Sequence, residues 1–212
     1  MRTFTRLSII AGVAVLAQAA FATINYNVLT ATVAYNNGDS NPLTVDTVGN
    51  SITFTSVPPI GVGDGFYTAN GHAAATVTII YTVQSDKALT GLDLIFTGSV
   101  FNKGEVSYSE LVENWNPNQG SGSVIADTSG VYKGAGVGGV DGGFDNSTAL
   151  DFGGKYFSYK VKKTFTLLDL DSNPSESVAS IGLVEQNAVP EPASMGALAI
   201  GALGLLARRR RK

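Results

Sequence analysis

Oxygen-bearing side chains that could bind a cation gather near residue 170. Asp169, Asp171 and Asn173 stand at alternate positions, and Glu176 follows them. Calcium is bound by several converging oxygen ligands, and calcium loops use this alternate spacing. Pro174 stands where a helix–loop–helix calcium site needs glycine, and an acidic turn between two strands is the simpler account. The first three residues are retained as calcium-ligand candidates.

Other residue types that could do chemistry are isolated. Asp141, Asp145 and Asp151 form a second candidate set for a cation in a glycine-rich stretch. His72 is the single histidine, so a Ser-His-Asp hydrolase would have to use it. It follows the turn signal Asn70-Gly71, which favours an exposed loop histidine. No two carboxylates stand out as a pair for glycoside cleavage, so we assign no catalytic residue and expect no enzyme.

Trp115 is the only tryptophan, and amide side chains flank it in Asn114-Trp115-Asn116. Such a ring could stack on a sugar, which makes Trp115 a ligand candidate. It could equally cap one end of a hydrophobic core. We favour the cap because burial of the large indole ring stabilises a fold strongly.

The charged residues are unevenly distributed along the 212-residue chain. Seven of the 14 basic residues lie in residues 1–22 and 208–212, so the body at 23–189 holds seven lysines, no arginine and 16 acidic residues, a net charge of −9. An acidic body is a poor ligand for nucleic acid, because phosphate binding needs clustered cations. The chain has no cysteine, which excludes disulfides and cysteine-based zinc sites.

Hydrophobic side chains alternate with polar ones in the body, as in half-buried strands. The pattern is clearest at 75–84, 92–101, 106–112 and 157–167, with shorter runs at 29–35, 52–54 and 179–183. No helical period appears between 23 and 189. The pattern predicts an all-β, antiparallel β-sandwich of the jelly-roll type. A β-solenoid is the alternative, but no repeat of fixed length is present.

Three local features complete this prediction. Asn102-Lys103-Gly104 separates two alternating runs and predicts a hairpin. Residues 116–154 hold eleven glycines and predict a long mobile connection with a short strand at 123–126. Thr76, Thr78 and Thr82 fall on predicted outward faces, where a flat array could order water, but the sequence shows no regular Thr-x-Thr repeat over several strands.

The first 22 residues have the features of a secretory signal peptide. Arg2 and Arg6 precede an apolar run at 7–17, and Ala20 and Ala22 supply the small residues before a cleavage site. Thr23 is then the new N-terminus. The run is too short to span a membrane comfortably, so we expect a cleaved signal helix.

The last 24 residues form a tail of three parts. Val189-Pro190-Glu191-Pro192 comes first, and its prolines predict an extended, accessible segment that cannot continue a strand ladder. An uncharged stretch at 193–207 predicts a short transmembrane helix, about 22 Å long at ~1.5 Å per residue. A basic end then stops transfer on the cytoplasmic side; it consists of Arg208, Arg209, Arg210, Arg211 and Lys212.

These three parts, in this order and at the end of the chain, resemble the PEP-CTERM sorting signal of bacterial exported proteins. The resemblance implies recognition by an exosortase, a membrane transpeptidase-like protease. It also implies cleavage near the Pro-Glu-Pro motif and delivery to the cell surface or extracellular polymer. A tail of this kind is also called an ice-binding protein C-terminal domain, a name that describes the sorting segment and implies no ice-binding mechanism for the body.

We therefore expect a signal peptide at 1–22, a β-sandwich at 23–188 and a sorting signal at 189–212. The expected role is structural or adhesive, at the cell surface or in the extracellular matrix, after a transient stay in the inner membrane. The alternative is a carbohydrate- or calcium-binding module, and an extracellular hydrolase is third. The expected partners are the exosortase, the secretion machinery, the membrane before processing and extracellular polysaccharide. No cofactor besides calcium and no nucleic acid is expected.

Overall fold

The fold is built almost entirely from β-strands. The computed structural model describes residues 22–63, 72–171 and 177–191, and within these ranges it contains nine strands and one short 3-10 helix, Ala135–Val137. All strand pairs are antiparallel, so the all-β prediction is confirmed. The strands are β1 (Ile24–Tyr35), β2 (Ser40–Pro42), β3 (Thr44–Val48), β4 (Ser51–Gly63), β5 (Ala74–Phe101), β6 (Gly104–Asn116), β7 (Gly120–Lys133), β8 (Gly142–Asp169) and β9 (Val178–Pro190).

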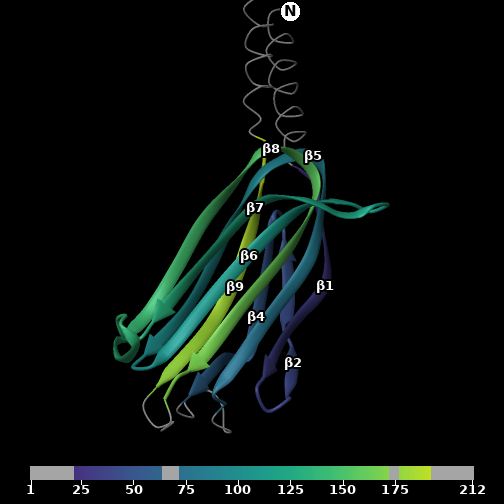
Figure 1. The fold of residues 1–212 in the computed structure, drawn as a ribbon. Coiled ribbons are helices and arrows are strands. Elements are labelled where there is room, and N and C mark those ends of the chain that lie inside the picture. Colours follow the sequence, from purple (N-terminus) through teal and green to yellow (C-terminus); the bar gives the residue numbers. More distant parts are fainter. Residues whose placement is uncertain (1–21, 64–71, 172–176, 192–212) are drawn as a thin grey trace, which may run out of the picture.

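Two long strands run through both layers of the sandwich. β5 and β8 have 28 residues each and pair with one another along nearly their whole length. Residues 74–84 of β5 and 158–169 of β8 form a first layer with β1, β2, β6 and β7. Residues 89–101 of β5 and 142–156 of β8 form a second layer with β3, β4 and β9. Figure 1 shows the strands running along the length of this flattened body.

The paired strands bend together where they pass from one layer to the other. Gln84 pairs with Ser158, but the next pair is Leu89 with Tyr156, so β5 contains four residues without a partner on β8. Extra residues on one strand disrupt the ladder locally and bend it. Because of this bend, residues 74–84 and 89–101 form one continuous strand, and each part directs its hydrophobic side chains into the core from a different layer.

Alternate side chains of the two layers form one hydrophobic core. Val77, Ile79 and Tyr81 point inward from the first layer, and Leu92 and Leu94 point inward from the second. Aromatic rings join the layers: the Phe54 and Tyr81 ring centroids lie 5.7 Å apart, and those of Phe96 and Phe165 lie 5.1 Å apart. Such tilted and edge-to-face contacts add to the stabilisation from buried area, which suits a body without disulfides.

The hairpin prediction at Asn102-Lys103-Gly104 was wrong. This turn joins the end of β5, in the second layer, to the start of β6, in the first layer, and the two strands do not pair. Asn102 takes the left-handed conformation, with φ of 51°, whereas the glycine is needed for space. A Cβ atom on Gly104 would lie 1.9 Å from the Val178 carbonyl oxygen.

The prediction of a long mobile connection at 116–154 was also wrong. β7 and nearly half of β8 occupy most of it, leaving only residues 117–119 and 134–141 between strands. Several of its glycines serve close packing: a Cβ atom on Gly130 would lie 2.5 Å from Cε1 of Tyr108. Rings also cover this side, where Tyr132 of β7 stacks on Phe144 of β8 at 3.9 Å.

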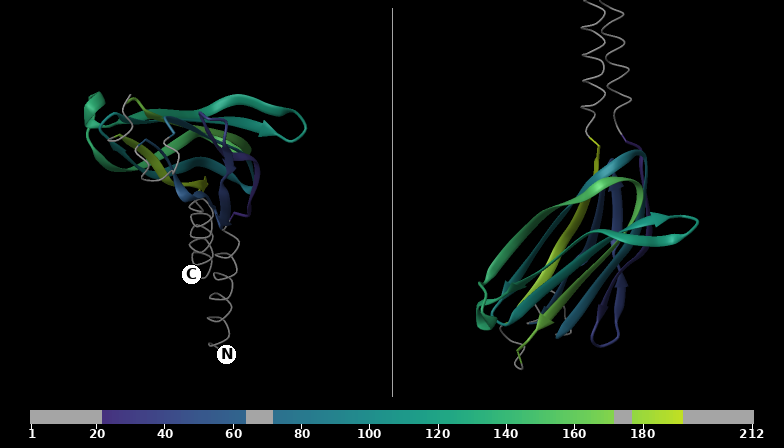
Figure 2. Two further views of the ribbon diagram at one scale, coloured as in Figure 1. Left: turned by 90° about the horizontal axis from the view of Figure 1, so that it is seen from below. Right: turned by 45° about the horizontal axis from the view of Figure 1, so that its top comes forward.

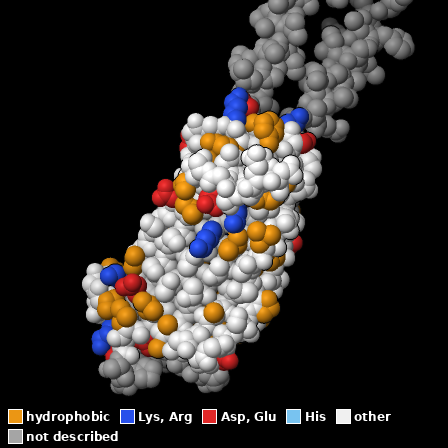
Figure 3. Space-filling model, turned by 45° about the vertical axis from the view of Figure 1, so that its right-hand side comes forward, with side chains coloured by type: hydrophobic (Ala, Val, Ile, Leu, Met, Phe, Trp, Pro, Cys, Tyr) orange, Lys and Arg blue, Asp and Glu red, His pale blue; other side chains and the backbone are white. Residues whose placement is uncertain are grey.

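The outer face of the first layer carries rows of hydroxyl groups across several strands. The register of β1, β5, β8, β6 and β7 aligns Thr-x-Thr and Ser-x-Ser segments that lie far apart in the sequence. Strand spacing sets neighbours in a row about 4.8 Å apart, and rows follow about 6.7 Å along the strands. In Figure 3 much of this side of the body carries neither charged nor hydrophobic side chains. One row is Thr32, Thr78, Thr164, Ser109 and Ser129, and the next contains Thr76, Thr166 and Ser107.

Candidate functional site

The predicted sorting motif begins inside the last strand of the sandwich. Val189 pairs with Gly91, and Pro190 pairs with Leu89, so both belong to β9. The prediction that this segment cannot continue a strand was therefore wrong for its first two residues. Proline lacks only an N–H donor, and at the last position of a strand this loss interrupts no further ladder.

Glu191 of the motif is attached to the body by two contacts. Its backbone N–H donates to the Ala88 carbonyl over 2.8 Å, and its Oε1 lies 2.5 Å from Nζ of Lys155. The lysine side chain is 60% exposed, so solvent screens this ion pair, which contributes little to stability. Pro192, the apolar stretch and the basic end from Arg208 to Lys212 lie outside the described residues.

The two described ends of the body meet at the same end of the sandwich. The backbone N–H of Thr23 donates to Oδ1 of Asp86 over 2.7 Å, beside the bend of β5. Glu191 contacts Ala88 of the same bend. Figure 2 shows the start of β1 and the end of β9 at the same end of the body. Ala22 lies just before this contact, whereas Ala20 and the predicted signal helix lie outside the described residues.

The membrane segments predicted from the sequence are not tested by the described residues. Within residues 22–63, 72–171 and 177–191, no helix is long and apolar enough to cross a membrane. The predicted signal helix and transmembrane helix both lie beyond these ranges.

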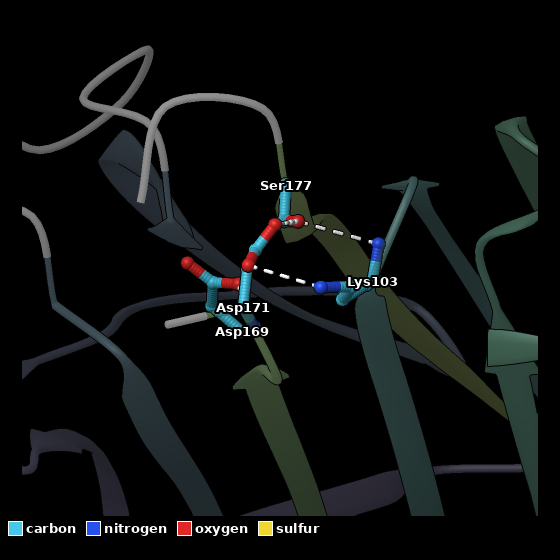
Figure 4. Close-up of polar contacts among 4 residues, drawn as sticks. All are labelled: Lys103, Asp169, Asp171 and Ser177. Atoms are coloured by element: carbon cyan, nitrogen blue, oxygen red, sulfur yellow. Dashed lines mark hydrogen bonds and ion pairs between the residues drawn. The ribbon is translucent and has the colours of Figure 1, made fainter. Parts of the chain in front are cut away.

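The first set of calcium candidates, Asp169 and Asp171, lies at the end of β8, where the Lys103 side chain contacts Asp171 (Figure 4). Asp171 Oδ1 lies 3.1 Å from Nζ of Lys103, and Ser177 Oγ donates to Asp171 Oδ2 over 3.5 Å. Asp169 is buried and accepts the Asp171 backbone N–H over 2.9 Å. The ammonium group thus supplies positive charge to a carboxylate that was one of the calcium-ligand candidates. Asn173 and Glu176 lie outside the described residues.

The second set of carboxylates does not converge. Asp141 Oδ1 accepts the backbone N–H groups of Asn102 and Ala135 over 2.6 and 2.9 Å, which fixes the turn after β5. Asp145 and Asp151 lie six residues apart on β8, about 20 Å at the usual rise of a strand. Among the residues that the structure describes, no three His, Cys, Asp or Glu side chains are grouped for a metal ion.

His72 is buried, and the prediction of an exposed loop histidine was wrong. Its side chain is 7% exposed and stacks on Tyr35, with ring centroids 4.3 Å apart. Its carbonyl accepts the backbone N–H of Gly63 over 2.8 Å. The histidine ring therefore packs against β1, and its backbone is hydrogen-bonded to the end of β4.

Trp115 is half-buried near the end of β6, where it pairs with Ser121 of β7. Its carbonyl accepts a hydrogen bond from Ser158 Oγ. The indole is not among the side chains that form the described hydrophobic core or pack against it, so the core-cap interpretation was wrong. The ring instead belongs to the β6–β7 hairpin at the end that carries the bend.

A buried polar cluster links the two layers, and the sequence analysis missed it. Glu110 of β6 pairs in register with Lys163 of β8, and both side chains are fully buried. Glu110 Oε1 accepts hydrogen bonds from Lys163 Nζ over 2.8 Å and from Gln186 Nε2 of β9 over 2.5 Å. The signal was present, because both charged residues fall on inward positions of alternating runs.

Burial changes the proton affinities around this cluster. Desolvation lowers the pKa of Lys163, although the Glu110 carboxylate acts in the opposite direction. Desolvation raises the pKa values of Tyr81 and Tyr159 well above their usual value of 10.0. Three buried atoms of the described cluster and its surroundings have no protein partner. They are Tyr81 Oη, Glu110 Oε2 and Gln186 Oε1.

The chain carries a PEP-CTERM protein-sorting motif at residues 188–212. This confirms the resemblance found in its three-part tail. A comparison with curated proteins finds no matching relative.

Several solved structures match this chain at low similarity. Tailspike protein 4 of bacteriophage CBA120 is 16% identical, with a TM-score of 0.30. The match covers 79% of this chain and only 19% of the tailspike chain. TmCBM61, solved in complex with β-1,4-galactotriose, is 8% identical, with a TM-score of 0.32 over 82% of this chain and 93% of its own. The cellulose-specific module CBM28 is 9% identical, with a TM-score of 0.36 over 75% and 86%. Similarity at this level carries no functional argument.

Proposed function

We propose that this protein is exported, sorted by an exosortase and retained as a structural or adhesive protein at the cell surface or in the extracellular matrix. The observation that carries the proposal is the PEP-CTERM motif at residues 188–212, which indicates an exported protein sorted through the membrane. The Pro-Glu-Pro segment of the motif begins at Pro190, the last residue of β9. Cleavage after this segment therefore leaves every described strand of the sandwich in place. The body is not an enzyme in this proposal.

The geometry of the ends supports this route. Thr23 and Glu191 both contact the bend of β5, so a signal peptide and a sorting tail leave the same end of the body. During export both segments can therefore reach one membrane. The predicted cuts are after Ala22 and near the Pro-Glu-Pro motif.

Intact mass spectrometry of the protein from its host tests the processing. The wild-type mass should correspond to loss of residues 1–22 and of the apolar and basic tail. Glu191→Ala should leave the tail attached and hold the protein in the membrane fraction. Lys155→Ala is the matched control, because it removes the same ion pair without changing the motif. A surface protein that still carries Arg208–Lys212 would contradict the proposal.

A second candidate function is the binding of a neutral polysaccharide by the hydroxyl rows of the first layer. Hydroxyl groups both donate and accept hydrogen bonds, and those of Thr78, Thr164 and Ser109 lie side by side across three strands. The arrangement matches a flat, hydroxyl-rich ligand better than a charged one. Trp115, at the end of β6, remains a candidate for stacking on a sugar ring.

Binding to insoluble polysaccharide from the host matrix tests this second candidate. The double variant Thr78→Val and Thr164→Val keeps side-chain shape and removes two adjacent hydroxyls, so the bound fraction should fall. Thr53→Val with Thr97→Val is the control, since both threonines lie on the outside of the second layer. Trp115→Ala tests the ring separately. Equal retention of all variants would rule out this face.

A further inference from the structure

β7 is the edge strand of the first layer. Among the described residues it pairs with β6 alone, and it ends the order of strands in the sheet. The Gly134 N–H donates to the Gly104 carbonyl on the β6 side over 2.9 Å. The Lys133 carbonyl instead accepts the Val140 N–H over 2.9 Å, on the opposite side.

These two contacts fix the direction of the backbone groups along β7. Successive residues of a strand direct their N–H and C=O groups to opposite sides. The register between β6 and β7 is continuous from Ala126 to Lys133. Asp127, Ser129 and Val131 therefore direct their backbone groups away from β6, toward the free edge.

The edge lacks most of the features that normally prevent pairing with another strand. Exposed edges in stable proteins are short, or carry prolines and several charges. β7 has 14 residues, no proline and two charged residues, Asp127 and Lys133. Val124 and Val131 are 52% and 51% exposed. A long edge of this kind is a template for a further strand.

We propose that a second copy of the chain pairs antiparallel along this edge, about a two-fold axis at Gly130. Asp127 then lies opposite Lys133 of the second copy, and the symmetry creates this oppositely charged pair twice. Val131 lies opposite Ser129 of the second copy. Ser129 and Val131 direct both backbone groups to the free edge and form hydrogen-bonded pairs, whereas Lys133, whose carbonyl is bonded to Val140, offers only its N–H group to Asp127.

Lys133 Nζ lies 3.3 Å from Oε2 of Glu105 in its own chain, so Asp127 of the second copy joins an existing ion pair on the lysine. This charge complementarity selects the register. Moving the axis by two residues, to Thr128, places Asp127 opposite Ser129 and Lys133 opposite Ser123, and both ion pairs are lost. The pairing ends at Lys133, because its carbonyl is already bonded to Val140. The first layers of the two copies become one continuous sheet, in which the hydroxyl row that ends at Ser129 meets Val131 of the second copy.

Cysteine cross-linking in the full-length protein tests the register, since the native chain has no cysteine. Ser129→Cys and Val131→Cys are made in separately tagged copies and expressed alone or together. Opposite residues of a hydrogen-bonded pair lie about 5.5 Å apart at Cα, within disulfide range, whereas diagonal neighbours lie about 7–8 Å apart. Only the mixture should give a dimer on a non-reducing gel.

Two controls keep the test independent of folding. Ser109→Cys mixed with Leu111→Cys reproduces the spacing on β6, an inner strand, and should give no dimer. Val131→Pro, added to the copy that carries Ser129→Cys, removes an N–H group that faces the free edge and leaves the β6 ladder intact, so it should abolish cross-linking of that copy to a Val131→Cys copy without lowering the melting temperature. No dimer from the mixture, or equal dimer from either variant alone, would overturn the proposed pairing.

Discussion

The buried ion pair between Glu110 and Lys163 allows a quantitative test of the fold. Lys163→Met keeps the length and apolar stem of the side chain and removes its charge. Glu110 then remains fully buried, with Gln186 Nε2 as its one hydrogen-bond donor and with Oε2 unpartnered. Removing one partner of a buried pair costs about 3–5 kcal/mol. Total stability is about 5–15 kcal/mol, so this single change should remove a large part of it.

A double variant distinguishes the effect of the ion pair from the effect of the side-chain volume. Lys163→Met with Glu110→Leu removes both charges, and replacement of a buried pair by apolar groups is often neutral. The double variant should therefore recover most of the loss of the single variant. Lys162→Met is the matched control, because this neighbouring lysine is exposed and its replacement should cost at most about 0.5 kcal/mol.

Urea unfolding followed by circular dichroism measures all three variants. A loss of 3–5 kcal/mol corresponds to a fall in melting temperature of about 6–20 °C for a domain of this size. Two results would refute the reasoning. One is a Lys163→Met variant within 1 kcal/mol of the wild type, and the other is a double variant as unstable as the single one.

Three further changes test other parts of the core. Tyr81→Phe deletes a buried hydroxyl without a protein partner, and stability in urea should stay the same or rise by about 1 kcal/mol; a loss above 1 kcal/mol would contradict this. Alkaline pH should lower the melting temperature, because burial raises the pKa values of Tyr81 and Tyr159. Above about pH 10 the unfolded chain releases these protons before the folded protein does. The free energy of unfolding then falls by about 1.4 kcal/mol per proton and pH unit. The lowered pKa of the buried lysine acts in the opposite direction below about pH 10.5, and an unchanged melting temperature between pH 10.5 and 12 would refute the tyrosine argument. Gly130→Ala should cost about 1–3 kcal/mol by overpacking against Tyr108, whereas Gly143→Ala, with 3.6 Å to its nearest neighbour, should be near neutral on thermal unfolding.

The alternation of hydrophobic and polar residues along the chain predicts most strands, because the side of each strand that faces the other layer must be apolar. The segments at 75–84 and 92–101 both form strand as predicted. That they form one strand depends on the bend between Gln84 and Leu89, where the pairing with β8 jumps. A jump of register arises from contacts between distant segments, and no local pattern reports it.

Glycine and histidine were misread for a related reason. A glycine-rich segment has the composition of a mobile loop, but Gly130 and Gly104 are required by neighbours far away in the sequence. His72 follows a turn signal, yet Tyr35 covers its ring. The hydroxyl rows were missed in the same way, since Thr78 and Thr164 become neighbours only through the register of β5 and β8.

The positions of the sorting end and of the proposed surfaces bear on whether one protein can use all of them. The ends at Thr23 and Glu191 leave the sandwich beside the bend of β5. Both proposed surfaces lie along the body, away from that bend. The hydroxyl rows cross β5 at residues 76–78. Residues 127–133 of β7 pair with residues 105–111 of β6. Sorting and processing therefore leave both surfaces free. A protein still attached to the membrane could pair through β7 or bind polysaccharide, and neither interaction would need to wait for cleavage of the tail.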